Sequence, residues 1–171
     1  MTIQIHDASL PYLSRFLRAL DRMIDKAAAF AEAKQGKSAV SVEASLINAR
    51  LAPDMFAFAR QVQIATDMAK GCAARLANVE VPKYEDTETT FAELKARIAR
   101  TVAFIESFKS DQLDGAEART IQLKTGGREV TFTGSDYLFG FVYPNVFFHL
   151  TTAYNILRHN GVELGKMDLL G

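Results

Sequence analysis

The chain has 171 residues, 49% of them apolar, and its 20 Lys and Arg residues balance its 20 Asp and Glu residues. This length fits a single domain, residues 1–171. Its apolar side chains are numerous enough to form a core that needs no disulfide bond or structural metal. A nucleic-acid-binding protein usually concentrates a basic excess on one face, whereas the charges here are mixed along the chain. We therefore expect no nucleic-acid partner.

The N-terminal sequence MTIQIHDASLPYLSRFL has neither the basic start nor the continuous apolar stretch of a signal peptide. No segment offers the roughly 18–20 uncharged apolar residues that a membrane span needs. The single cysteine, Cys72, cannot form an internal disulfide, which fits a reducing compartment. We expect a soluble cytoplasmic protein with no membrane partner.

Apolar residues recur every three or four positions in three long segments, which predicts three amphipathic helices that share a core. The first helix spans about residues 8–34 and presents Leu13, Phe16, Leu17, Leu20, Met23, Ile24, Ala27 and Phe30. The second presents Met55, Phe58, Val62, Ala65, Ala69, Cys72 and Leu76, and its small residues indicate a close neighbouring helix. The third begins after EDTETT and presents Phe91, Leu94, Ile98, Val102, Ile105 and Phe108.

The stretch RTIQLKTGGREVTFT, residues 119–133, changes to a period of two around a TGG turn. This pattern predicts a β-hairpin inserted between the third and fourth helices. An isolated hairpin is only marginally stable in water, so we expect its apolar side to lie on the bundle. It would act there either as a structural cap, which we favour, or as a lid over one end.

A fourth helix is predicted directly after the hairpin, with Thr133 or Ser135 as its cap and Gly161 at its end. Pro144 interrupts the pattern, so the segment is either one bent helix or a short helix followed by a longer one. Two seams of this helix are apolar. The helix is therefore either buried centrally, which we favour slightly, or contacts another subunit in a homodimer.

Two histidines of the fourth helix, His149 and His159, are about 15 Å apart along the axis, too far to share one metal ion. Asn145, His149 and Thr152 form a short polar strip on this apolar helix. We favour a buried His149 that an amide or hydroxyl satisfies; the alternative is a pocket in which the imidazole acts as acid, base or donor. His159 is expected at the helix C-terminus, and His6 on the surface.

The second helix is expected to carry Asp54 and Gln61 on one flank, either facing an internal cavity or, as we favour, at the edge of a helix interface. Cys72 falls on the apolar seam, and we interpret it as a small core residue. The carboxylates of YEDTETTFAE indicate a solvated turn followed by the acidic first turn of a helix. The sequence has no Walker loop, no glycine-rich dinucleotide fingerprint and no Cys-x-x-Cys pair.

Two stretches of the sequence and the hairpin between them carry a resemblance: RLAPDMFAFARQVQIATDMAKGCAARLA and TFTGSDYLFGFVYPNVFFHLTTAYNILRHNGVELGK. They resemble an uncharacterised bacterial family related to the DinB-like four-helix bundles. The resemblance implies an all-α, up-down-down-up four-helix bundle with a small β-hairpin between helices 3 and 4 and a long crossing connection over residues 78–87. Related proteins often hold a divalent metal with three histidines, one from the second helix and two from the fourth, and some use it in thiol transfer or hydrolysis.

This chain departs from that histidine pattern, because its second helix has no histidine and its fourth keeps only His149 in an interior position. We therefore expect no bound metal and no cofactor. One functional hypothesis is a small-molecule binding protein or enzyme that uses a degenerate pocket between the second and fourth helices. The alternative is a non-catalytic helical module that acts through oligomerisation or partner binding. The candidate pocket residues are His149, Asn145, Asp54, Gln61 and Thr152.

Overall fold

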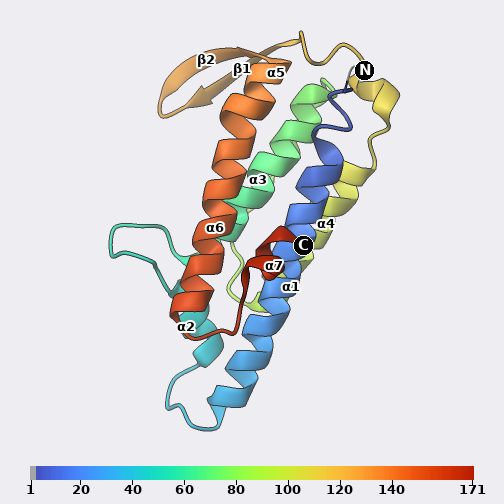
Figure 1. Ribbon diagram of the computed structural model, residues 1–171. Helices are drawn as coiled ribbons and strands as arrows, with labels where there is room; N and C mark the ends of the chain where they lie inside the picture. Colours follow the sequence, from blue (N-terminus) through green and yellow to red (C-terminus); the bar gives the residue numbers. More distant parts are fainter. Residues whose placement is uncertain (1–2) are drawn as a thin grey trace.

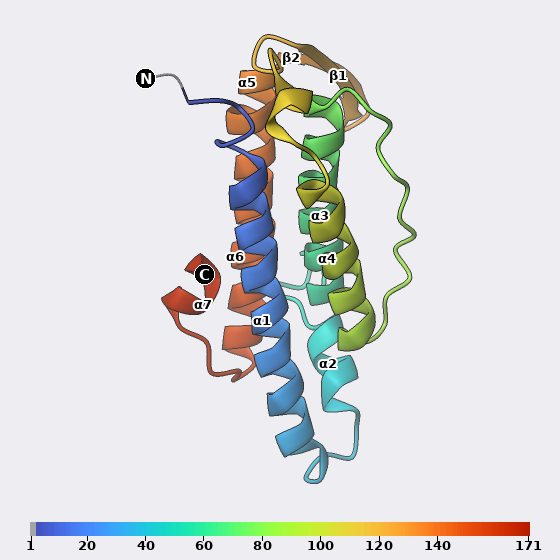
Figure 2. The same ribbon diagram turned by 90° about the vertical axis from the view of Figure 1, so that its right-hand side faces the viewer.

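A computed structural model describes residues 3–171 of the chain. Four long helices form a bundle: α1 (Leu10–Gln35), α3 (Phe58–Leu76), α4 (Phe91–Glu106) and α6 (Tyr143–His159). In Figures 1 and 2, α1 and α6 run in one direction and α3 and α4 run in the other. The predicted up-down-down-up four-helix bundle is therefore confirmed, and within the described residues no helix is long and apolar enough to cross a lipid bilayer.

The core lies along the predicted apolar seams of the four helices. Fully buried side chains of α1 include Leu13, Leu17, Leu20 and Met23, and each such side chain contributes on the order of 1.5–3 kcal/mol on burial. The small residues predicted to allow close helix contact, Ala65, Ala69 and Cys72, are fully buried on α3, and the most extensive helix contact of α3 is with α6.

Three short helical segments were not predicted: α2 (Val42–Asn48), η1 (Ser110–Leu113) and α7 (Lys166–Leu170). The Ser41 hydroxyl accepts a hydrogen bond from the backbone N–H of Ala44 and so caps α2, which buries Leu46 and Ile47 in the core. Helix α3 begins at Phe58, so Met55, which was expected on the apolar seam of this helix, lies in the segment before it.

The α3–α4 connection runs along most of the bundle, because α3 and α4 are parallel (Figure 2). Its end is fixed by a capping box: the Thr90 hydroxyl accepts from the N–H of Glu93 at 3.2 Å, and the Glu93 carboxylate accepts from the N–H of Thr90 at 3.0 Å. The long crossing connection that the resemblance implied is present, and it begins after α3 ends at Leu76.

The hairpin pairs β1 (Thr120–Thr125) with β2 (Arg128–Thr133) and covers one end of the bundle (Figure 1). Gly126 and Gly127 both have positive φ, 55° and 78°, as a tight two-residue turn requires. Its apolar side lies on the bundle as predicted: Ile121 is buried, and the Phe132 ring lies 5.5 Å from that of Phe141.

The fourth helical segment is continuous from residue 134 to residue 159, through α5 (Gly134–Asp136), the π-helical turn η2 (Tyr137–Val142) and α6. The Thr133 hydroxyl caps it by accepting from the N–H of Asp136. The predicted interruption takes the form of the π turn, which ends at Val142, two residues before Pro144. A proline has no N–H to donate to the preceding turn, and the local change to π-helical geometry accommodates it within the continuous segment. Gly161, with φ of 95°, follows the end of α6.

Candidate functional site

The interior histidine of α6 contacts a glutamine of α3. His149 is 8% exposed, and its Nδ1 atom lies 2.7 Å from Oε1 of Gln61, which is 1% exposed. The prediction of a buried histidine satisfied by an amide is confirmed. That amide belongs to the neighbouring helix and not to Asn145, which the sequence places one turn earlier on the same helix.

The orientation of the Gln61 side chain determines which imidazole nitrogen carries the proton. Gln61 Nε2 donates a hydrogen bond to the backbone oxygen of Phe56 at 2.9 Å. A carbonyl oxygen only accepts, so the amide NH₂ must face Phe56 and Oε1 must face the imidazole. His149 Nδ1 is therefore the donor, and in the neutral ring Nε2 carries the lone pair.

The charge of the ring is set by its surroundings. Burial lowers the pKa of His149 below its ordinary value, and the nearby positive charge of Arg60 lowers this pKa further. The imidazole is therefore neutral at pH 7.

The lone-pair nitrogen, Nε2, has no hydrogen-bond partner among residues 3–171. It is not fully buried, since Ser14 Oγ is the one fully buried side-chain polar atom in that range that lacks a partner. His149, which is 8% exposed, thus holds a fixed and incompletely buried acceptor between α3 and α6.

The three other predicted pocket residues do not join this pair. Asn145 donates to the backbone oxygen of Phe141 at 2.7 Å, and the Thr152 hydroxyl donates to that of Phe148 at 2.7 Å, so both side chains bond within their own helical segment. Asp54 lies in the turn before α3 and is exposed, so the prediction that it lies on the helix is wrong.

These side chains do not fit the metal that the related bundles often hold. A tetrahedral transition-metal site requires at least three imidazole, thiolate or carboxylate ligands from the protein. The side chain that accompanies His149 is the neutral amide of Gln61. Across residues 3–171, no three His, Cys, Asp or Glu side chains lie close enough together to hold a metal ion. The site therefore offers a single imidazole nitrogen as its reactive atom.

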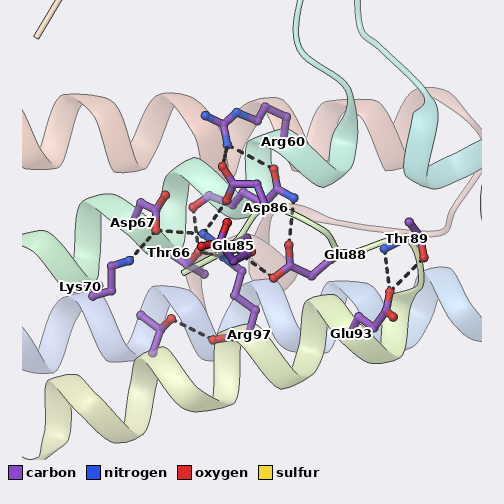
Figure 3. A network of polar contacts seen from close by, with 12 residues as sticks. Arg60, Thr66, Asp67, Lys70, Glu85, Asp86, Glu88, Thr89, Glu93 and Arg97 are labelled. Carbon is purple, nitrogen blue, oxygen red and sulfur yellow. Dashed lines mark hydrogen bonds and ion pairs between the residues drawn. The ribbon is translucent and has the colours of Figure 1, made fainter. Parts of the chain in front are cut away.

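A second polar cluster surrounds Arg97 of α4, which is 2% exposed (Figure 3). Its guanidinium contacts Asp67 of α3 at 2.9 Å and two carboxylates of the α3–α4 connection, Asp86 at 3.0 Å and Glu88 at 3.0 Å. Its Nε donates to the hydroxyl of Thr66 at 2.8 Å. The cluster fixes the long connection against α3 and α4.

Sequence reasoning missed this cluster and read the acidic connection as solvated. One signal was present: Arg97 lies three residues after Leu94 and four before Thr101, on the buried face of α4. A buried arginine needs anionic partners, and the neighbouring acidic segment supplies them. Arg60 links the two sites, because it pairs with Asp86 and its charge lowers the pKa of His149.

An exposed aromatic surface lies on the other side of α6, facing α1. Phe16 packs edge-on against Phe147 with ring centroids 5.1 Å apart, and Tyr143 stacks on Phe147 at 5.3 Å. With Tyr12 and Phe139 these rings line a groove of about 820 Å³. The slightly favoured prediction that this helix is buried centrally is wrong on this side, because Phe139 and Phe147 are 57% and 41% exposed. The alternative, contact with another subunit, stays a prediction.

Comparison with known proteins agrees with the fold. A family model described as "Domain of unknown function (DUF1993)" matches residues 5–170. A crystal structure of a DinB family member protein from Shewanella denitrificans is similar with a TM-score of 0.84 and 43% identity, covering 98% of this chain and 92% of that chain. No curated protein matches. The chain therefore belongs to the DUF1993 family of domains of unknown function, which has the DinB-like fold.

Proposed function

We propose that the protein binds a small molecule at the surface between α3 and α6, and that His149 Nε2 accepts a hydrogen bond from it. The observation that carries the proposal is the chain of contacts from the Phe56 backbone oxygen through Gln61 to His149 Nδ1. A histidine held in one tautomer by a second residue is typical of sites where the other ring nitrogen acts on a ligand.

The chemistry of the site favours a ligand that carries a hydroxyl, amine or thiol donor. A neutral Nε2 accepts such a hydrogen bond, and it can also take up the proton if the bound group is acidic enough. Aromatic surface is available nearby, because the Phe148 ring packs edge-on against His149 at 5.2 Å and is itself exposed. We retain a cytoplasmic location as part of this proposal, since the buried Cys72 is a free thiol.

A fragment screen that compares three proteins would test this proposal: wild type, His149→Gln and, as a control, His159→Gln at the exposed end of the same helix. Hydroxyl, amine and thiol fragments should raise the melting temperature of wild type and of the control, but not of His149→Gln. Binding should weaken as the pH falls and Nε2 is protonated. Fragments that stabilise all three proteins equally would contradict the proposed site.

A second candidate function is self-association through the aromatic groove on α1 and α6. Contiguous exposed aromatic surface of this kind is common where proteins contact each other. If this groove mediates a homodimer, the wild-type chain should sediment as a dimer and Phe147→Ser as a monomer. A monomeric wild type at concentrations up to about 1 mM would rule out all but the weakest contact.

A further inference from the structure

The aromatic groove on α1 and α6 is bounded at one end by the N-terminal segment and by the loop between η1 and β1. Its volume, about 820 Å³, falls in the range of small-molecule sites. Asp7 of the N-terminal segment and Glu117 of the loop line it together with the aromatic side chains. In Figures 1 and 2 the N-terminal segment lies at the same end of the bundle as α5 and the hairpin. The groove therefore joins an aromatic wall to an acidic end.

Two hydrogen bonds hold this acidic end against the segment that carries the aromatic wall. The Tyr143 hydroxyl donates to the backbone oxygen of Ala8, the residue after Asp7. The backbone N–H of Ser135 donates to the backbone oxygen of Glu117 at 3.0 Å. The backbone of both acidic residues is thus fixed beside the fourth helical segment.

Both charged side chains that line the groove are acidic. Glu117 is exposed and has no ion-pair partner among residues 3–171. Asp7 contacts the imidazole Nδ1 of His6 at 2.9 Å, and a neutral imidazole donates such a hydrogen bond without cancelling the carboxylate charge.

The surrounding sequence supplies no counter-charge. Residues 3–14 and 134–157, which provide most of the groove, contain no Lys and no Arg. Arg15 follows in α1, but its guanidinium donates to the backbone oxygen of Gly171 and lines a different cavity. The groove is therefore electrostatically negative.

The aromatic wall adds to this preference for positive charge. Phe139, Tyr143 and Phe147 recur every four residues on one face of the fourth helical segment. The ring centroids of Phe139 and Tyr143 are 6.0 Å apart, and those of Tyr143 and Phe147 are 5.3 Å apart. The face of an aromatic ring attracts a cation, and Phe139 and Phe147 are exposed. The wall and the acidic end thus favour the same ligand, one with an apolar body and a positive charge.

We propose that this groove binds a small organic cation, an amine with an aromatic or aliphatic body. Its ammonium group donates charge-assisted hydrogen bonds to Glu117 and Asp7, and its body packs on Phe139 and Tyr143. An organic anion of the same shape is repelled by the two carboxylates. This site is separate from the one at His149, which does not line the groove.

Charge also distinguishes this ligand from a second copy of the chain, which is the other candidate occupant of the groove. A two-fold symmetric dimer brings the same surface patch of both subunits together. The side chains that line the groove include no Lys or Arg to pair with Asp7 and Glu117 of the other copy. A small cation supplies the positive charge that a second copy of this face lacks.

Three indole compounds of similar shape test the sign of the charge: tryptamine, which is a cation, indole-3-ethanol, which is neutral, and indole-3-propionate, which is an anion. In an NMR titration of the full chain, tryptamine should shift the backbone amides of Glu117 and Phe139. Indole-3-ethanol should bind about tenfold more weakly, because it lacks the charge, and indole-3-propionate more weakly still. Added salt should weaken the binding of tryptamine but not that of indole-3-ethanol. Equal affinity for the three compounds, or no shift at these residues, would overturn the proposal.

Variants at exposed positions separate the two contributions. Glu117→Gln should weaken tryptamine binding about tenfold and leave indole-3-ethanol binding unchanged, whereas the control Glu129→Gln on β2 should change neither. Phe139→Leu keeps an apolar side chain but loses the ring face, so it should weaken tryptamine binding about threefold or more. The matched control is Phe56→Leu, which is similarly exposed and lies outside the groove. Full tryptamine affinity in Glu117→Gln would overturn the proposal.

Sedimentation tests the competing occupant. Tryptamine and a second copy of the chain cannot fill the groove together. If wild type forms a dimer that Phe147→Ser abolishes, saturating tryptamine should convert this dimer to monomers. A dimer that Phe147→Ser abolishes and that saturating tryptamine leaves intact would overturn the proposal.

Discussion

Replacing His149 with alanine tests the contact between α3 and α6. The change removes a nearly buried imidazole and leaves Gln61 Oε1, on a side chain that is 1% exposed, without its donor. Gln61 Nε2 keeps its bond to Phe56, so the amide cannot simply turn to recover the loss. We therefore expect His149→Ala to be destabilising even in the absence of any ligand.

The size of the effect follows from two contributions. A buried acceptor left without a donor costs about 1–3 kcal/mol. The void adds about 1 kcal/mol, a low value for a large-to-small change because His149 is at the edge of the core and 8% exposed. The free energy of unfolding should fall by about 2–4 kcal/mol, which for a chain of this length lowers the melting temperature by about 4–16 °C.

Urea denaturation followed by circular dichroism would measure this change, with His159→Ala as the matched control. His159 is exposed at the end of α6, so its replacement should change the free energy of unfolding by less than about 0.5 kcal/mol. A double-mutant cycle with Gln61→Leu should show coupling between the two residues. Equal and negligible effects of both histidine variants would refute the placement of His149.

Three further outcomes are expected. Because the pKa of His149 is lowered in the folded protein, its contribution to stability is present above about pH 6.5 and is lost as the pH falls below that value; pH-dependent denaturation should show this loss, and His149→Gln should lack it. Gly134→Ala should destabilise by about 1–3 kcal/mol or more, because its Cβ would lie 1.7 Å from a backbone oxygen, whereas Gly140→Ala has open space; thermal melts of the two would differ clearly. Arg97→Ala should lower the free energy of unfolding by about 3–5 kcal/mol, because its carboxylate partners lose their counter-charge. Limited proteolysis should then cut the α3–α4 connection. An uncut connection would mean that other contacts hold it.

The fold could be predicted from the sequence where local pattern and tertiary burial agree. The seams of the four long helices and the hairpin have clear periods, and Gly126 and Gly127 specify the turn. The short helix α2 was missed because seven residues give too little periodicity, although Ser41 was a usable capping signal. The π turn before Pro144 depends on how the whole helix packs, which local sequence does not specify.

The site was only partly predictable, for a physical reason. Periodicity placed His149 inside and Gln61 on a flank of the second helix, but it could not show that the two side chains meet, because that depends on how α3 and α6 align. Asn145 and Thr152 were grouped with His149 because they share its helix; their side chains instead bond to carbonyls four residues earlier. Only helix-to-helix geometry distinguishes these outcomes.

The central claim is that His149 is a neutral imidazole with the proton on Nδ1 and a free lone pair on Nε2. Two-bond ¹⁵N–¹H correlation NMR of the uniformly labelled protein at pH 7 reports the protonation of each ring nitrogen directly. The predicted spectrum has a protonated Nδ1 and an unprotonated Nε2 for His149, and Gln61→Leu should abolish this preference. A proton on Nε2, or a doubly protonated ring at pH 7, would contradict the account.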